Sequence, residues 1–300
     1  MFHFEMMNVD VVPNSPFGKW QYCMPNLHQI KKIMSRWQVE LDVVNGWNSV
    51  FIENHDTPRS VSRFGNDVSP ELREISAKML ASWMMLLKGT PFIYQGQEIG
   101  TPNAYFDDLN DYRDIETFNA YKEMITRRAP EVVMDSIKRI SRDNARTPMQ
   151  WSSEELGGFS ELSSWIKPNP SFKSLNVAQG RADATSVWHY YRRLMEFRKK
   201  HTAIIYGTYR IILEDHPEIY AYLRTLDNEV ILVICNFFDK CPQFSLPQNM
   251  VSAWSGFKFT KHFCNYDDIV EEGVDLEHIR QINLRPYESR VYSVMRCLNA

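Results

Sequence analysis

The chain has 300 residues, of which 44% are hydrophobic, and a formal net charge of −3 at pH 7. This length and composition support a well-buried globular core and exclude a disordered chain. The balance of Lys and Arg against Asp and Glu, without a basic block, argues against nucleic acid and against an anionic membrane surface as partners.

The five cysteines show no C-x-x-C pair, so we expect idle thiols and neither a zinc site nor a disulfide framework. No motif indicates a cofactor, and we expect none. The first ten residues, MFHFEMMNVD, hold two acidic residues and no preceding Lys or Arg, unlike a signal peptide. The most apolar helical run, Met79–Leu87, is too short to cross a bilayer, so we expect no membrane span and a reducing, cytoplasmic setting. The cysteines are Cys23, Cys235, Cys241, Cys264 and Cys297.

Strand and helix patterns alternate over the first 95 residues. Short apolar runs predict strands, apolar residues at helical spacing predict helices, and Ser69-Pro70 is a cap with proline at the first helical position. Strands separated by helices indicate parallel βα units. In chain order we predict a strand at Phe2–Val9, a helix at Pro25–Gln38, a strand at Ser49–Glu53, a helix at Glu71–Leu87 and a strand at Thr90–Gln95.

The remainder of the chain divides into an irregular segment and a β-rich tail. Residues 101–183 are rich in Asn, Asp, Pro and Ser, with helical patterning near Ile115–Ile140, and we interpret them as a long functional excursion. A helix is predicted at Ser186–Lys200. From about Ile204 apolar and polar residues alternate, and Asp227-Asn228 is a hairpin signal. We therefore expect an α/β barrel part at residues 1–203 and an antiparallel β-sandwich at residues 204–300.

The stretch FIENHDTPRSVSRFGND, residues 51–67, places many chargeable groups directly after an apolar run. Side chains at the carboxyl ends of parallel strands point into the site of such folds, which favours function for Asn54, His55 and Asp56. The alternative is that Asp56 or Thr57 caps a helix that Pro58 begins, with Arg59 and Arg63 solvated. A cap leaves His55 and Asn54 unexplained.

Three further segments decide between these interpretations: KKIMSRWQ at residues 31–38, GTPFIYQGQEIG at residues 89–100 and SRDNARTPMQW at residues 141–151. Together with residues 51–67 they closely resemble the α-amylase superfamily of glycoside hydrolases, in particular its oligo-1,6-glucosidase, maltase and dextran-glucosidase group. The four segments stand in the family's order and at family-like spacing, and the resemblance covers essentially the whole chain. It implies a (β/α)8 barrel followed by an antiparallel β-sandwich.

The resemblance implies roles for three residues. Asp56 would be one of three catalytic carboxylates, holding hydroxyls of the sugar ring whose bond is broken, and His55 would donate a hydrogen bond to the same ring. Arg142 would clamp the far hydroxyls of a terminal glucose. The substrate implied is a short gluco-oligosaccharide. Arg146 is interpreted as structural, and Glu98 is given no catalytic role.

The family's nucleophile and acid/base have no counterpart in this sequence, because both belong to upstream segments and no GFRxD occurs here. The motifs correspond to about strands six to eight of the barrel, so we expect a missing N-terminal barrel portion, and with it the family's metal-binding loop. Alone, the chain is expected to be inactive. Two alternatives are a split-gene glucosidase completed by another chain, and a non-catalytic relative resembling the heavy subunits of amino-acid transporters.

Overall fold

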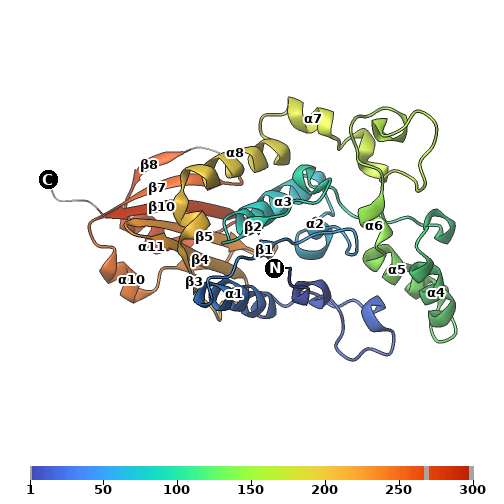
Figure 1. Ribbon diagram of the computed structural model, residues 1–300, viewed down its shortest axis with the longest axis horizontal. Coiled ribbons are helices and arrows are strands. Elements are labelled where there is room, and N and C mark those ends of the chain that lie inside the picture. Colours follow the sequence, from blue (N-terminus) through green and yellow to red (C-terminus); the bar gives the residue numbers. More distant parts are fainter. Residues whose placement is uncertain (1, 267–269, 297–300) are drawn as a thin grey trace.

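The computed structural model describes residues 2–266 and 270–296, so Cys297, one of the thiols expected to be idle, lies outside the described residues. A helical part that carries one short parallel strand pair is joined to an antiparallel sheet domain (Figure 1). The described chain starts near the middle of the molecule and ends at the outer end of the sheet domain. Among the described residues no helix is long and apolar enough to span a membrane.

The barrel part contains one parallel strand pair, β1 with β2, in the register Ser49↔Thr90 and Val50↔Pro91. Each strand is only two residues long, shorter than the sequence predicts. Helix α3 begins where predicted, because the Ser69 side chain accepts a hydrogen bond from the backbone N–H of Leu72 and proline occupies the first turn. The elements are α1 (Leu27–Val43), β1 (Ser49–Val50), α2 (Ser60–Phe64), α3 (Pro70–Met85), β2 (Thr90–Pro91) and α8 (Val187–Lys200).

The strand predicted at Phe2–Val9 is wrong: this segment contains a 3-10 helix, Glu5–Asn8, and both Phe2 and Phe4 are exposed. A barrel strand is held by backbone pairing with neighbours on both sides, and the short β1 offers too little edge for such pairing. The ring of Phe2 instead packs against Phe51 and Phe92, with centroids 5.6 and 4.7 Å away.

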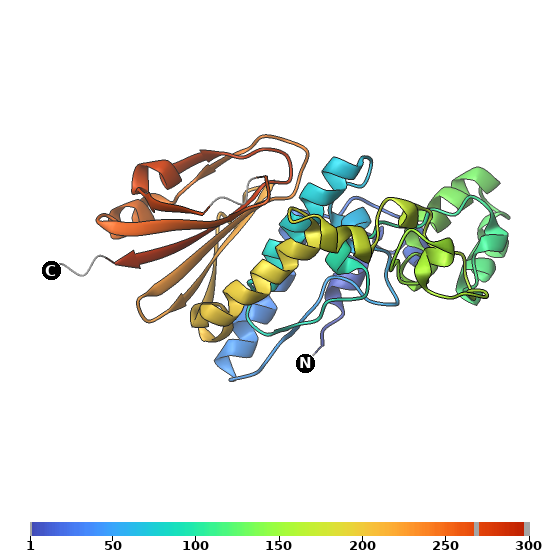
Figure 2. The same ribbon diagram turned by 90° about the horizontal axis from the view of Figure 1, so that it is seen from above.

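The excursion between β2 and α8 forms a helical cluster with its own small core, which includes Phe106, Tyr112 and Ile137. The helical pattern predicted across Ile115–Ile140 is broken into two helices, because Pro130 begins a new one. The excursion lies at the end of the molecule opposite the sheet domain (Figure 2). Its helices are α4 (Ile115–Met124), α5 (Pro130–Ile140), α6 (Asp143–Arg146) and α7 (Val177–Ala182).

The C-terminal domain is a six-stranded antiparallel sheet in the order β3-β4-β5-β10-β7-β8, with a two-stranded sheet, β6-β9, beside it. Strands β4 and β5 form the predicted hairpin, in which Asp227 adopts a left-handed conformation between Leu226 and Glu229. The two sheets enclose a core, confirming the predicted sandwich. The elements are α9 (Thr202–Tyr206), β3 (Thr208–Ile212), β4 (Ile219–Leu226), β5 (Glu229–Asn236), β6 (Gln243–Ser245), α10 (Gln248–Ala253), β7 (Phe257–Cys264), β8 (Glu271–Val274), α11 (Leu276–Arg280), β9 (Gln281–Asn283) and β10 (Ser289–Arg296).

Helix α3 joins the two parts, because it packs against α8 on one side and against β5 and β10 on another. Trp83 of α3 is fully buried, and its backbone carbonyl accepts a 2.8 Å hydrogen bond from the Tyr222 hydroxyl in the sheet domain. The guanidinium of Arg198, on α8, donates to the carbonyls of Met85, Leu87 and Gly89, just before β2. A continuous core therefore fixes the strand pair from which the candidate site extends. The predicted fold class, a partial barrel followed by an antiparallel domain, is confirmed.

Candidate functional site

The turn after β1 is held by a buried ion pair. The side chains of Glu53 and Arg59 are 1% and 2% exposed, and Arg59 Nη1 lies 2.7 Å from Glu53 Oε1. The other carboxylate oxygen accepts from the backbone N–H and the hydroxyl of Ser60, at 2.9 and 2.7 Å. Arg59 also donates to the carbonyls of Gln95 and Asn144. Arg59 is therefore structural and buried, in contrast to the solvated role that the capping interpretation assigns to it.

Asp56 sits at the apex of this turn and does not cap a helix. Its backbone N–H donates to the Asn54 side chain at 2.8 Å, and this local turn does not use the Asp56 carboxylate. Helix α2 begins only at Ser60, and its N-cap, Arg59, makes no side-chain capping bond. The capping alternative for Asp56 is therefore wrong. The Asp56 side chain is 40% exposed.

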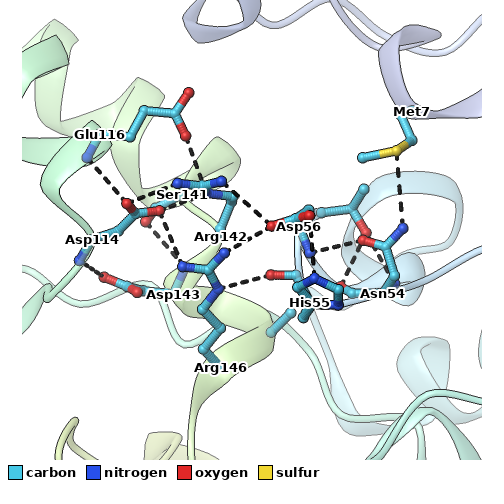
Figure 3. A network of polar contacts seen from close by, with 12 residues as sticks. Met7, Asn54, His55, Asp56, Asp114, Glu116, Ser141, Arg142, Asp143 and Arg146 are labelled. Atoms are coloured by element: carbon cyan, nitrogen blue, oxygen red, sulfur yellow. Dashed lines mark hydrogen bonds and ion pairs between the residues drawn. The ribbon is translucent and has the colours of Figure 1, made fainter. Parts of the chain in front are cut away.

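Three cationic or donor groups surround the Asp56 carboxylate (Figure 3). Arg146 Nη2 lies 2.8 Å and Arg142 Nη1 3.4 Å from Oδ1, and His55 Nε2 lies 3.3 Å from Oδ2. Arg146 also donates to the His55 backbone carbonyl at 2.8 Å, which ties α6 to the strand-end turn. The structure thus brings together the three residues singled out from the sequence, Asp56, His55 and Arg142, and adds Arg146.

A second carboxylate, Asp114, fixes the two arginines. Arg142 contacts it with two nitrogens, Nε at 2.6 Å and Nη2 at 2.9 Å, and Arg146 Nη1 lies 3.4 Å from it. The Asp114 side chain is 4% exposed; burial acts to raise its pKa, but the Arg142 hydrogen bonds and a backbone N–H outweigh burial and lower it. The same hydrogen bonds raise the pKa of Arg142. Both groups therefore stay charged at neutral pH.

Asp56 and Arg142 line a cavity of about 270 Å³ together with residues of the N-terminal segment, Lys19 and Asp10 among them. Glu116 also lines it, and its carboxylate lies 2.8 Å from Lys19 Nζ and 3.1 Å from Arg142 Nε. The wall therefore offers hydrogen-bond donors and acceptors side by side around one half-exposed carboxylate. Such a lining suits a polar, hydroxyl-bearing ligand.

Other acidic and aromatic side chains of the barrel part lie outside this cavity. Burial raises the pKa of Glu98, opposed by the backbone amides of Glu98 and Gly96, and its Oε2 is buried without a partner in the described chain. Glu5 pairs with Arg36 of α1. Trp151 and Trp165 are half exposed. Within residues 2–266 and 270–296, no group of three His, Cys, Asp or Glu side chains could hold a metal ion.

Sequence reasoning missed Asp114 and treated Arg146 only as structural. Asp114 precedes α4 and accepts from the N–H of Glu116, so in sequence it reads as an ordinary helix cap. Its pairing with Arg142 spans 28 residues along the chain, and that of Arg146 with Asp56 spans 90. The available signal was the sequence R-D-x-E at residues 113–116, where α4 begins, followed later in the chain by the two arginines.

The fold and the site together define a barrel-type α/β protein with a polar strand-end cavity and a C-terminal antiparallel domain. Residues 1–207 match the family profile "Alpha amylase, catalytic domain", and residues 209–290 match "Maltogenic Amylase, C-terminal domain". The chain belongs to the alpha-amylase family.

Curated relatives include an oligo-1,6-glucosidase of Parageobacillus thermoglucosidasius, 46% identical over 296 residues, which cover 98% of this chain and 50% of that protein. A trehalose-6-phosphate hydrolase of Bacillus subtilis (strain 168) is 37% identical over 297 residues, with 98% and 50% covered. The chain spans about half the length of the curated relatives it matches.

Solved structures of similar proteins have the same fold as this chain over about half of their length. The chain superposes on trehalose-6-phosphate hydrolase of Bacillus licheniformis with a TM-score of 0.90 and 38% identity, covering 98% of this chain and 51% of that one. For an isomaltulose synthase of Klebsiella sp. LX3 the TM-score is 0.84 and the identity 31%, covering 98% and 50%.

Proposed function

We propose that this chain forms the sugar-holding half of the active site of a retaining α-glucosidase, which hydrolyses α-glucosidic bonds in short gluco-oligosaccharides of the maltose or isomaltose type. The observation that carries the proposal is the Asp56 carboxylate, half exposed in a polar cavity and held by Arg146, Arg142 and His55. Relatives named as oligo-1,6-glucosidases and an α-glucosidase support the substrate class.

In this proposal Asp56 accepts hydrogen bonds from two hydroxyls of the terminal glucose, and His55 donates to the same ring. Ring hydroxyls become more acidic as an oxocarbenium-like transition state develops, so bonds to a fixed carboxylate strengthen there. Arg142 would hold the far hydroxyls. Because its guanidinium is already fixed by Asp114, it would meet the sugar in one orientation.

The nucleophile and the acid/base would come from the other half of the barrel, whether that half belongs to the same polypeptide or to a second one. A retaining mechanism needs these two carboxyl groups about 5–5.5 Å apart. Near Asp56 the described acidic groups do not meet this need. Asp114 and Asp10 are each bound bidentately by an arginine, and Glu116 pairs with Lys19. The 300 residues alone are therefore proposed to be inactive.

Two further assignments belong to this proposal. We divide the chain into a partial barrel at residues 1–203 and a C-terminal domain at residues 204–300, since the last long helix of the barrel part, α8, ends at Lys200 and the first strand of the sheet, β3, begins at Thr208. We also assign the enzyme to the cytoplasm. Its support is that Cys23, Cys235 and Cys241 are free thiols, as in a reducing compartment.

The test is hydrolysis of p-nitrophenyl α-glucoside by the 300-residue chain, first alone and then mixed or co-expressed with the N-terminal half of the Parageobacillus thermoglucosidasius oligo-1,6-glucosidase. We expect no turnover by the chain alone and measurable turnover by the pair. Turnover by the chain alone would contradict the proposed division of the catalytic groups. A stable but inactive pair would contradict the glucosidase assignment.

A further inference from the structure

A second and larger cavity, of about 460 Å³, lies where the barrel part meets the C-terminal domain. Its wall comes from the segment before α1 with the start of that helix, from α2 with the turn that follows it, from helix α5, and from the loops flanking β5 and β10. We propose that this cavity is a second binding pocket for a neutral sugar of mono- or disaccharide size. The proposal is built on the lining of this cavity and is independent of the proposed function.

Aromatic side chains from both parts of the molecule line the cavity. Tyr22 comes from the segment before α1, Phe238 from the loop after β5, and Tyr287 from the loop before β10. The backbone N–H of Tyr287 donates to the Phe238 carbonyl at 3.1 Å, so the two loops hold their rings as one unit. Aromatic side chains that line a pocket suit the apolar C–H face of a pyranose ring.

Two charged groups of opposite sign border these rings. The guanidinium of Arg139 lies 5.4 Å from the Tyr22 ring centroid and forms no ion pair with any described residue. Asp67 Oδ2 accepts from the hydroxyls of Ser62 and Tyr105, at 2.5 and 2.8 Å, while its Oδ1 accepts from no described donor. Sugar hydroxyls both donate and accept, so they match this mixed rim. An anion would meet the Asp67 carboxylate and be repelled.

This pocket is separate from the cavity that Asp56 and Arg142 line. The side chain of Arg63 borders both, and its guanidinium is bound to Asp10 with two hydrogen bonds, of 2.8 and 2.7 Å. Arg63 belongs to α2, which begins four residues after Asp56. The two cavities therefore share a rigid wall but present different residues to a ligand.

The experiment is a ligand-observed NMR titration of the 300-residue chain with maltose, performed in the Asp56→Asn background so that the Asp56 cavity is weakened. We expect saturable maltose binding that Arg139→Ala or Tyr22→Ala weakens about tenfold or more, since each removes one wall of the pocket. The matched control is Arg128→Ala, which removes an arginine placed over the ring of Phe17, away from this pocket. The control should bind maltose as the background does.

Three results would overturn the proposal. One is no saturable maltose binding in the Asp56→Asn background. Another is binding that Arg139→Ala and Tyr22→Ala change by less than about twofold. The third is glucose 6-phosphate binding at least about tenfold more tightly than maltose, which would make the pocket an anion site. None of these results depends on turnover by the proposed glucosidase.

Discussion

Replacing Glu53 with alanine tests whether the buried pair with Arg59 holds the turn that carries Asp56. The substitution removes a carboxylate that accepts from Arg59 and twice from Ser60. It leaves the guanidinium of Arg59, 2% exposed, with only the carbonyls of Gln95 and Asn144 as acceptors. A buried charge thereby loses its counter-charge.

The expected loss in free energy of unfolding is about 3–5 kcal/mol, the usual result of removing one partner from a buried ion pair. That is a large share of the roughly 5–15 kcal/mol by which domains are stable. Glu53→Gln keeps the shape but presents an amide N–H to one of the donors, so we expect a smaller loss of about 1–3 kcal/mol.

The assay is urea unfolding followed by tryptophan fluorescence, with the slope of the free energy against urea compared between variants. The matched control is Glu196→Ala, which breaks a surface pair with Arg192 whose side chains are 59% and 54% exposed. It should change the free energy by less than about 0.5 kcal/mol. If Glu53→Ala were as mild as Glu196→Ala, the reasoning about this turn would be refuted.

Three further predictions concern stability and are read from the same urea unfolding. Burial, and after it the nearby His201, lowers the pKa of His262 to about 4 in the folded chain, from an ordinary value of 6.5. The neutral imidazole therefore makes its full contribution to the free energy of unfolding above pH 6.5. That contribution, at most about 3 kcal/mol, is lost as the pH falls from 6.5 to 4. His262→Gln should flatten that pH dependence; an unchanged slope would contradict it. Trp83→Ala, at a fully buried ring, should destabilise by about 3–5 kcal/mol, and a loss under about 1 kcal/mol would show that the two parts do not share this core. Gly89→Ala should destabilise by more than about 1 kcal/mol, because Gly89 has φ +125° and a Cβ there would lie 2.4 Å from the Asn48 carbonyl oxygen; unchanged stability would disprove this close approach.

Local signals in the sequence predict the elements whose cause is local. The Ser69-Pro70 cap and the helix after Ser186 are confirmed, since each depends on a side chain bonding its own first turn. The strands of the C-terminal domain form where the alternation predicts them, but the central strands β4 and β5 are buried on both faces, because alternate residues join the core shared with the barrel part and the core inside the sandwich. The segment at Phe2–Val9 differs: its apolar pattern fits a strand, but pairing partners decide whether one forms.

In the candidate site, too, the residues marked by a local sequence pattern could be predicted and the contacts between distant segments could not. That Asn54, His55 and Asp56 follow a buried strand is visible in sequence, and the motif resemblance adds Arg142. The role of Asp114 in fixing Arg142 was not predictable, since its partner is set by how the excursion folds back onto the strand ends. The second cavity was also invisible, because Tyr22, Arg139 and Tyr287 come from three distant parts of the chain.

The most direct test of the account is the effect of Asp56→Asn on the enzyme reconstituted with the N-terminal half of its relative. The measurement is kcat and kcat/KM for maltose and isomaltose, beside Asp107→Asn, a control whose carboxylate is 93% exposed. We expect Asp56→Asn to lower both quantities about a hundredfold to a thousandfold, because the hydrogen bonds from the sugar hydroxyls to the Asp56 carboxylate strengthen in the transition state. Asp107→Asn should leave them unchanged. Retention of full activity by Asp56→Asn would contradict the central claim that this carboxylate holds the reacting sugar.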